Sequence, residues 1–172
     1  MGVRTTFNLL GPLTNPAGAT RQIVGVPRPE LTQVMARALM QLGSERAWVV
    51  HGAGGIDEIS TTGHTKVSEC RDGAVHTFFI HPTEFGIAKA SPADLAGGEA
   101  STNAAIVGRV LEGQRGPYRD IVVRNAGAAL LVAGRARSVR EGIAAAVAAI
   151  DSGAARATLA RMVRASQAEA VA

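Results

Sequence analysis

Cysteine is almost absent from this chain, since Cys70 is the only one among its 172 residues. A single cysteine excludes an internal disulfide, so core packing must stabilise the fold. Such sparing use of cysteine is typical of proteins in a reducing compartment, and we expect the protein to be cytoplasmic. Cys70 falls in a predicted strand, where it is expected to be a small core residue rather than a nucleophile.

Aromatic residues are also scarce, with one Trp, one Tyr and four Phe, so Ala, Val, Leu and Ile must fill most of the core. The net charge is +4, and a positive charge attracts phosphorylated small molecules as well as nucleic acid. The basic residues are scattered or lie near the carboxy terminus, and no aromatic residues alternate with them. Because base-stacking surfaces need such aromatics, the sequence does not favour nucleic acid as a partner.

Long apolar runs are missing too. No stretch approaches the roughly 20 apolar residues that span a bilayer, and no basic segment followed by an apolar one stands at the amino terminus. We therefore expect neither a membrane span nor secretion. A chain of this length buries roughly 70% of its unfolded surface, and 47% of its residues are hydrophobic. We expect a single domain over residues 1–172.

Strand and helix patterns alternate in the first half of the chain. Residues 22–26 and 47–51 are short apolar runs typical of buried strands, and residues 31–42 between them have apolar residues at helical spacing. A strand, a helix and a strand in this order predict a βαβ unit with parallel strands. Two further strands, 66–70 and 75–80, flank Arg71-Asp72-Gly73, which is a hairpin signal.

The second half is expected to be mostly helical. Helices are predicted over residues 103–112, 118–133, 139–150 and 154–166, with Ser152 as the cap of the last one. The predicted fold class is therefore α/β, with a partial central, mostly parallel sheet, flanking helices and a helical carboxy-terminal part.

The first candidate site is the segment that begins at Arg4, continues through Asn8 and ends in a predicted polar turn at Asn15 and Pro16. Arg4 and Asn8 are one helical turn apart, so they lie on one side of a helix. A guanidinium with backbone donors beside it can hold an anionic ligand. Spacing alone favours the alternative, which is a plain helix followed by a turn.

The second candidate site is the pair Asp57-Glu58, which follows the glycines at the end of strand 47–51. Loops at the carboxyl ends of strands form the usual ligand crevice of open α/β sheets. Adjacent side chains diverge, so the pair suits two ions, or one ion bound partly through water. Mg²⁺ fits such a pair because it keeps waters and binds substrate phosphates. A solvated acidic turn is the alternative.

Other chemistries have little support in the sequence. Gly52-Ala-Gly-Gly55 does not open into a helix, as a dinucleotide-binding fingerprint requires. None of the four histidines has a histidine partner at i+4 or a cysteine pair nearby, so the sequence does not favour a zinc centre. A G-x-S-x-G nucleophile elbow is absent from the sequence, which leaves serine hydrolase chemistry unsupported.

The wording of these segments resembles one enzyme family. The stretch Arg-Thr-Thr-Phe-Asn-Leu-Leu-Gly-Pro-Leu-Thr-Asn-Pro at residues 4–16 is similar to the RTxFNxLGPLTNP signature of anthranilate phosphoribosyltransferases. The resemblance continues through residues 49–52, 55–58, 85–86, 95–99, 103–104, 119–120 and 125–126.

The resemblance implies a glycosyltransferase of tryptophan biosynthesis. Such an enzyme moves a phosphoribosyl group from phosphoribosyl pyrophosphate (PRPP) to anthranilate and releases pyrophosphate. The resemblance implies that Arg4 binds anthranilate, with Asn15 and Pro16 nearby, and that Asp57 and Glu58 bind Mg²⁺. It also implies that the complete enzyme is a homodimer.

The glycine-rich GTGGD loop and the KHGN segment of that family have no counterpart in this sequence. We therefore expect the chain to be the carboxy-terminal part of a larger catalytic domain and to be inactive alone. The amino-terminal helical domain and the phosphate-binding loops would then be absent. The alternative is a noncatalytic paralogue that binds nucleic acid or a partner protein, since one fold hosts many functions. A third possibility is a pyrimidine nucleoside phosphorylase, a related family with the same fold, but the segment at Arg4 matches the anthranilate enzymes better.

Overall fold

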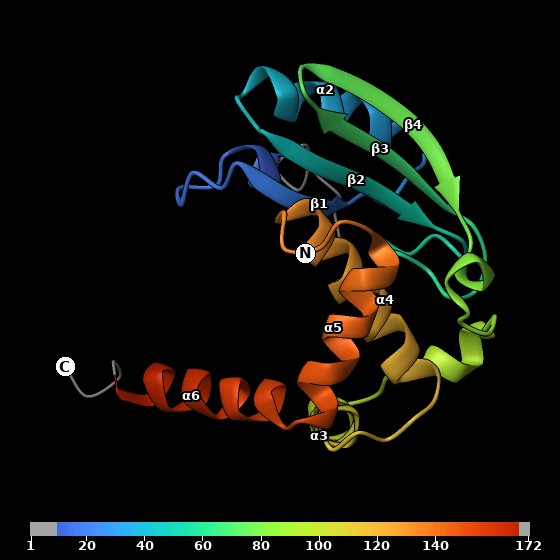
Figure 1. Cartoon of the computed structure of the whole chain (residues 1–172), viewed down its shortest axis with the longest axis vertical. Coiled ribbons are helices and arrows are strands. Elements are labelled where there is room, and N and C mark those ends of the chain that lie inside the picture. Colours follow the sequence, from blue (N-terminus) through green and yellow to red (C-terminus); the bar gives the residue numbers. More distant parts are fainter. Residues whose placement is uncertain (1–9, 169–172) are drawn as a thin grey trace.

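The computed structural model describes residues 10–168 and confirms the α/β class (Figure 1). Each predicted strand is found to within one residue at either end. The strands are β1 (Arg21–Gly25), β2 (Arg46–Gly52), β3 (Thr65–Arg71) and β4 (Ala74–Ile80).

The sheet is mixed, whereas the sequence predicted a mostly parallel one. Its strand order is β1-β2-β3-β4. The pair β1–β2 is parallel, as the βαβ pattern predicts, and α2 (Leu31–Gln41) connects the two strands. The pairs β2–β3 and β3–β4 are antiparallel. Parallel neighbours need a crossover connection, usually a helix, and the connection from β2 to β3 contains no helix.

The hairpin between β3 and β4 turns at Asp72 and Gly73, as predicted. Their φ angles are 51° and 75°, so both residues are in the left-handed region. A two-residue turn with this geometry matches the right-handed twist of the strands, and Asp-Gly is one of its preferred sequences. The hairpin signal in the sequence is therefore confirmed.

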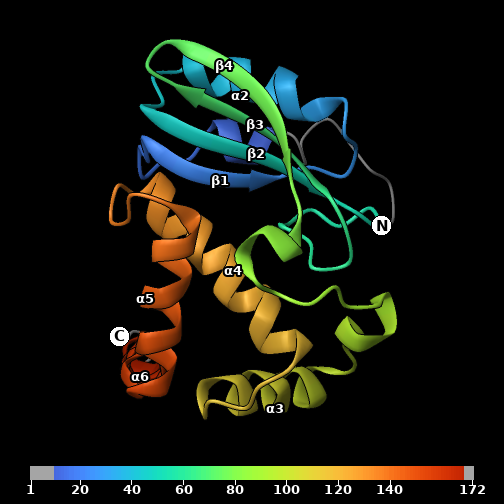
Figure 2. The same cartoon turned by 45° about the vertical axis from the view of Figure 1, so that its right-hand side comes forward.

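Strand β2 is buried on both of its faces. Ala47 and Val49 lie in one core cluster with residues of α2, and Trp48 and Val50 lie in another with residues of α4 (Pro117–Val132). Successive side chains of a strand point to opposite faces, so a strand covered on both sides shows a continuous apolar run. Figure 2 shows α2 on one side of the sheet and α4 and α5 (Val139–Asp151) on the other. Cys70 is buried in the cluster beside α2, as expected.

The helices of the second half form a layer of their own beside the sheet. Helices α4 and α5 pack against each other, and α3 (Ala100–Leu111) joins them at the end far from the sheet. A third core cluster holds this part together, and its buried members are Val110, Val123, Ala146 and Ile150. The chain therefore supplies one sheet with α2 on one face and this helical layer on the other, where α4 contacts the parallel strands β1 and β2.

Helix α6 (Ala154–Ala168) has no buried residue and extends away from the rest of the chain (Figure 1). Ser152 caps the carboxyl end of α5 rather than the amino end of α6, so the predicted cap is wrong. The Ser152 hydroxyl donates a hydrogen bond back to the Ala149 carbonyl at 3.4 Å. Within residues 10–168 no individual helix has the length and hydropathy to cross a bilayer. Helices α5 and α6 reach them only when joined, and they are bent by 70°.

Candidate functional site

The predicted carboxylate pair lies at the edge of the sheet where β1 and β2 end. Asp57 and Glu58 are exposed and belong to the connection between β2 and β3. Because β1 and β2 are parallel, their carboxyl ends meet at this edge, which is where open α/β sheets bind ligands. The chain turns back sharply here, since the Gly52 N–H donates a hydrogen bond to the Ile56 carbonyl at 2.8 Å. We call residues 56–60 the carboxylate turn.

Two glycines allow the carboxylate turn to lie directly against the strand ends. A Cβ atom on Gly25, the last residue of β1, would fall 1.6 Å from the Asp57 carbonyl oxygen. A Cβ atom on Gly52, the last residue of β2, would fall 2.5 Å from the Glu58 carbonyl oxygen. Real Cβ atoms essentially never come within 3.0 Å of a neighbouring atom. The backbone of the pair therefore touches both parallel strands, and this contact requires glycine at positions 25 and 52.

Helix α4 holds the carboxylate turn from its other end. The Asn125 Oδ1 accepts a hydrogen bond from the Ile59 N–H, and the Asn125 Nδ2 donates one to the Ile59 carbonyl, both at 2.9 Å. The Ile59 side chain is fully buried in the cluster that contains Trp48. In the sequence, Asn125 counted only toward the family resemblance. The sequence signal for its role is an asparagine inside a predicted helix, because asparagine is unfavourable in helix interiors and is kept there for a particular contact.

Arg124 precedes Asn125 and is completely buried beside the same turn. Its Nη1 donates a hydrogen bond to the Ser60 carbonyl, and its guanidinium carbon lies 5.5 Å from the centre of the Phe85 ring. Burial lowers the pKa of Arg124 to about 10, while the negative charge of Glu84 acts in the opposite direction. The Nε and Nη2 atoms of Arg124 find no hydrogen-bond partner within the part of the chain that the structure describes. A buried cation of α4 thus holds the end of the carboxylate turn.

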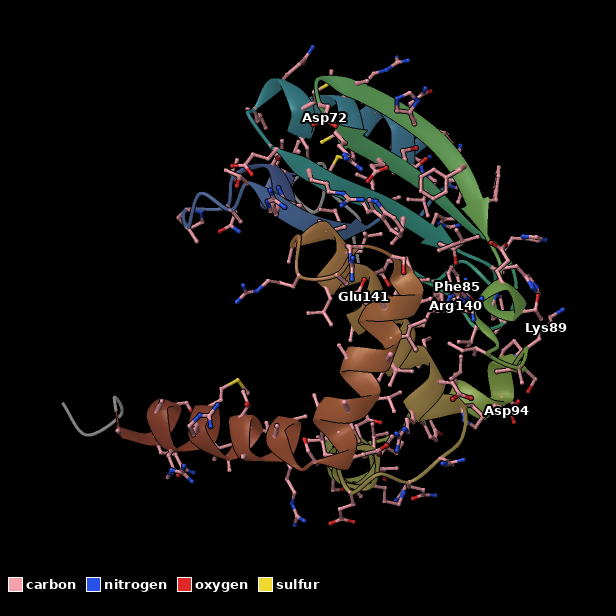
Figure 3. The ribbon with its side chains drawn as sticks, viewed as in Figure 1. Asp72, Phe85, Lys89, Asp94, Arg140 and Glu141 are labelled. Carbon is pink, nitrogen blue, oxygen red and sulfur yellow. The ribbon has the colours of Figure 1, made fainter. Side chains whose placement is uncertain are left out.

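A second connection packs against the turn. It follows β4 and contains η2 (Pro82–Phe85) and η3 (Pro92–Leu95). Arg140 of α5 donates a hydrogen bond to the Glu84 carbonyl, and Figure 3 shows Arg140 and Phe85 close together at this edge. The Ala90 N–H donates a hydrogen bond to the Thr61 carbonyl at 3.0 Å. Helix α5 is therefore bonded to this connection, and the connection is bonded to Thr61, the residue that follows the carboxylate turn.

The carboxylate pair carries a charge that a divalent cation would neutralise. Although Glu58 is exposed as a residue, neighbouring protein atoms partly shield its carboxyl group from water and raise its pKa, and the charge of Asp57 raises it further. No cluster of three or more His, Cys, Asp or Glu side chains exists within residues 10–168 that could enclose a metal ion. Mg²⁺ accepts one or two protein carboxylates and completes its shell with water and phosphate oxygens. The donor set at Asp57 and Glu58 therefore fits Mg²⁺.

We expect the substitution Asp57→Asn to lower the pKa of Glu58 without restoring its ordinary value of 4.5. The substitution removes the neighbouring negative charge, whereas the burial of the carboxyl group, which is the larger cause of the shift, remains. A ¹³C NMR titration of the Glu58 carboxyl carbon in both proteins measures the effect. Identical titration curves would show that the two carboxyl groups do not interact.

The raised pKa of Glu58 also makes the stability of the folded chain depend on pH. The folded chain holds this proton more strongly than the unfolded chain does, so Glu58 contributes less to stability as the pH rises from 4.5 through the folded-state pKa. A cation that binds the ionised pair in the folded state opposes this loss, because it binds the folded chain preferentially.

The predicted polar turn at Asn15 and Pro16 is confirmed as a structure. It follows η1 (Gly11–Leu13) and is exposed. The Gly18 N–H donates a hydrogen bond to the Asn15 carbonyl, and the Ala17 N–H donates one to the Asn15 Oδ1, both at 3.0 Å. The Asn15 side chain thus stabilises its own turn, as asparagine commonly does.

This turn does not lie next to the carboxylate pair. Asn15 lines a surface cavity with Gln22, which stands at the beginning of β1, and Ser44, which precedes β2. The turn is therefore at the amino ends of the parallel strands, whereas the carboxylate turn is at their carboxyl ends (Figure 1). Arg4 lies outside the described residues. The structure thus separates the Asp57-Glu58 pair from Asn15 and Pro16.

Comparison with known proteins connects this arrangement to named enzymes. The anthranilate phosphoribosyltransferase of Azorhizobium caulinodans is 55% identical over 168 residues, which are 98% of this chain and 49% of that protein. The chain therefore spans about half the length of the curated relatives that it matches.

Solved structures share the fold. The crystal structure of anthranilate phosphoribosyltransferase from Thermus thermophilus is 44% identical, with a TM-score of 0.86, over 95% of this chain and 48% of that one. The enzyme from Saccharomyces cerevisiae in complex with PRPP and Mg is 31% identical, with a TM-score of 0.79, over 88% of this chain and 44% of that one. The model of a family described as "Glycosyl transferase family, a/b domain" matches residues 1–156. The chain belongs to this glycosyl transferase family.

Proposed function

We propose that this chain forms the carboxy-terminal half of an anthranilate phosphoribosyltransferase. The observation that carries the proposal is the Asp57-Glu58 pair, which is exposed at the carboxyl ends of two parallel strands on a tightly held turn. The chain matches the carboxy-terminal half of the relatives, and the related yeast enzyme has been solved with PRPP and Mg. The reaction is the transfer of the phosphoribosyl group from PRPP to anthranilate.

In this proposal Asp57 and Glu58 hold Mg²⁺. The ion, when bound, neutralises charge on the pyrophosphate of PRPP and so makes it a better leaving group. The two carboxylates place that positive charge at the sheet edge, and Gly25, Gly52 and Asn125 keep the carboxylates in place. The amine nitrogen of anthranilate then forms the new bond to the ribose carbon as the bond to pyrophosphate breaks, and the amine loses one proton. Positioning and charge stabilisation are the main demands of such a step.

Arg4 is proposed to bind the carboxylate of anthranilate, because a planar guanidinium matches a carboxylate in two parallel hydrogen bonds. The yeast relative has also been solved in complex with 4-fluoroanthranilate. Asn15 and Pro16 stand at the opposite end of the strands from the carboxylate turn. We propose that they belong to the segment that carries Arg4 and line the entrance for anthranilate.

The proposed site is half of a complete one. The resemblance places the phosphate-binding loops and a helical domain in the amino-terminal half of the enzyme, so we propose that the chain is inactive alone. The complete enzyme is proposed to be a homodimer in the cytoplasm. The net charge of +4 is then compatible with a phosphorylated substrate and needs no nucleic acid partner.

The test is a chimeric enzyme in which residues 1–172 of this chain replace the matching carboxy-terminal half of the Azorhizobium caulinodans relative. We expect the chimera to consume anthranilate in the presence of PRPP and Mg²⁺, which the loss of anthranilate fluorescence measures. The chain alone, at the same concentration, is expected to show no turnover. In the chimera, Arg4→Ala should raise the KM for anthranilate by roughly 10-fold or more while the KM for PRPP stays unchanged, since a charge-assisted hydrogen bond contributes ~1.5–3 kcal/mol.

Equal effects of Arg4→Ala on both KM values would remove Arg4 from the anthranilate site. A folded chimera without activity would contradict the proposed function as a whole. Binding of DNA by the folded chain, with a steep loss of affinity as salt rises, would then support the noncatalytic alternative.

A further inference from the structure

We propose that Asn125 is a positioning residue that sets the orientation of the Asp57-Glu58 pair toward its cation. This inference rests on the proposed function, in which the pair holds Mg²⁺. Asn125 stands on α4 and touches neither carboxylate through a hydrogen bond. It acts through Ile59, the residue that follows Glu58.

The hydrogen bonds of Asn125 fix the direction of its amide group. Its Oδ1 accepts from the Ile59 N–H, and its Nδ2 donates both to the Ile59 carbonyl and to the Ile121 carbonyl, all three at 2.9 Å. Rotation of the amide by half a turn would set donor against donor and acceptor against acceptor. The side chain therefore has a single orientation, and it binds both backbone polar groups of one residue.

The residue that Asn125 holds is immobilised in a third way as well. The Ile59 side chain is fully buried in the core cluster between the sheet and α4. With its side chain and both backbone groups fixed, Ile59 leaves little freedom to the backbone of Glu58 before it. At the other end of the turn, Gly25 allows the Asp57 backbone to lie against β1. The two carboxylates are thus the exposed part of a segment whose two ends are fixed.

Helix α4 is a firm support for this contact. Its residues Ala128 and Val132 are buried in the same core cluster as Ile59, and the neighbouring Arg124 donates a hydrogen bond to the Ser60 carbonyl. Two consecutive residues of the helix therefore bind two consecutive residues of the turn. Partners of this kind, which hold the residues around a metal rather than the metal, commonly change metal affinity when they are replaced.

The experiment compares Asn125→Ala with the unchanged sequence, each as the carboxy-terminal half of the chimeric enzyme described above. We expect the Mg²⁺ concentration for half-maximal activity to rise by roughly 10- to 100-fold, while the KM for anthranilate stays unchanged. Hydrogen exchange of the peptide that contains residues 56–60, measured by mass spectrometry, is expected to accelerate because the Ile59 N–H loses its acceptor. The exchange measurement does not depend on activity.

Asn103→Ala is the matched control. The Asn103 Oδ1 accepts a hydrogen bond from the Gly98 N–H at 2.9 Å, and the Asn103 Nδ2 donates one to the Gly98 carbonyl at 2.8 Å. This asparagine makes the same pair of backbone contacts to a different loop, although it is exposed and lacks the third hydrogen bond of Asn125. We expect faster exchange around residues 97–98 and an unchanged requirement for Mg²⁺.

The substitution Asn125→Gln tests whether the exact position of the amide matters, or only that the Ile59 N–H and carbonyl have hydrogen-bond partners. Glutamine offers the same donor and acceptor without a change of charge, but it moves them by one methylene. We expect Asn125→Gln to keep the fold and to raise the Mg²⁺ requirement as Asn125→Ala does. If both Asn125 variants leave the Mg²⁺ requirement unchanged while Asp57→Ala or Glu58→Ala raises it, the positioning role is wrong and the proposed function stands. If no carboxylate variant alters the response to Mg²⁺, the proposed function fails, and the exchange data still report whether Asn125 holds the turn.

Discussion

Replacing Asp57 and Glu58 together by alanine is expected to abolish the dependence of the chimeric enzyme on Mg²⁺ and most of its activity. The two carboxylates are the only charged side chains of the carboxylate turn, residues 56–60. A metal ion supplies several kcal/mol of charge stabilisation to a leaving phosphate group. Each ~1.36 kcal/mol corresponds to a factor of ten in rate, so kcat/KM for PRPP should fall by roughly 100-fold or more. A Mg²⁺ titration of the initial rate measures both effects.

The double substitution should leave the fold intact, because both residues are exposed and the atoms next to the strands are their backbones and the Asp57 Cβ, which alanine keeps. Removal of two neighbouring negative charges relieves the repulsion that contributes to the raised pKa of Glu58. We therefore expect thermal stability without Mg²⁺ to be unchanged or higher. Glu45→Ala is the control for a lost surface carboxylate, since Glu45 is exposed and its ion pair with Arg21 lies at the opposite end of β1. A normal Mg²⁺ titration of the double variant would exclude the pair as the metal site.

The position of the carboxylate pair was predictable because its signals are local. The apolar run of β2, the glycines after it and the two acidic residues follow one another within about a dozen positions. The βαβ pattern then states that β1 and β2 are parallel, so their ends meet. Nothing in this inference needs a contact between distant parts of the chain.

The support of the pair was not predictable in the same way. Asn125 is 66 residues from Ile59, and no periodicity links the two positions. The contact of Gly25 with Asp57 likewise depends on how closely a turn approaches a neighbouring strand. Such contacts follow from tertiary packing, and sequence patterns show them only as residues that contradict local preference. Asn125 inside α4 is one of these.

The relative directions of the strands were likewise only partly predictable from local sequence signals. The hairpin at Asp72 and Gly73 indicates that β3 and β4 are antiparallel. It does not indicate that β3 pairs with β2. That pairing is the second antiparallel one in the sheet. The prediction of a mostly parallel sheet extended the βαβ unit to β3, although the sequence gives no signal for how β3 pairs with β2. The predicted class was right because each element type was locally encoded.

Gly25→Ala is expected to impair the Mg²⁺ response nearly as much as removal of the carboxylates, although it adds only a methyl group. The new Cβ would lie 1.6 Å from the Asp57 carbonyl oxygen. The turn must withdraw by about 1.4 Å (3.0 minus 1.6 Å) to reach even the shortest contact that Cβ atoms make. The obstacle is backbone, so no side-chain rotation relieves it. A misplacement of about 1 Å can cost roughly 100-fold in rate, and overpacking of this kind costs ~1–3 kcal/mol of stability.

Gly108→Ala is the matched control for this substitution. Gly108 lies within α3, and a Cβ there meets nothing within 4 Å. Because alanine favours a helix over glycine by about 1 kcal/mol, this variant should melt at the same or a higher temperature and keep the normal Mg²⁺ requirement. The two Gly→Ala variants are therefore expected to change stability in opposite directions. A chimera in which Gly25→Ala retained both the wild-type melting temperature and the wild-type Mg²⁺ requirement would show that the Asp57 backbone does not rest on β1. Gly52, Arg124 and Asn125, which contact the turn from β2 and α4, would then be what holds the pair.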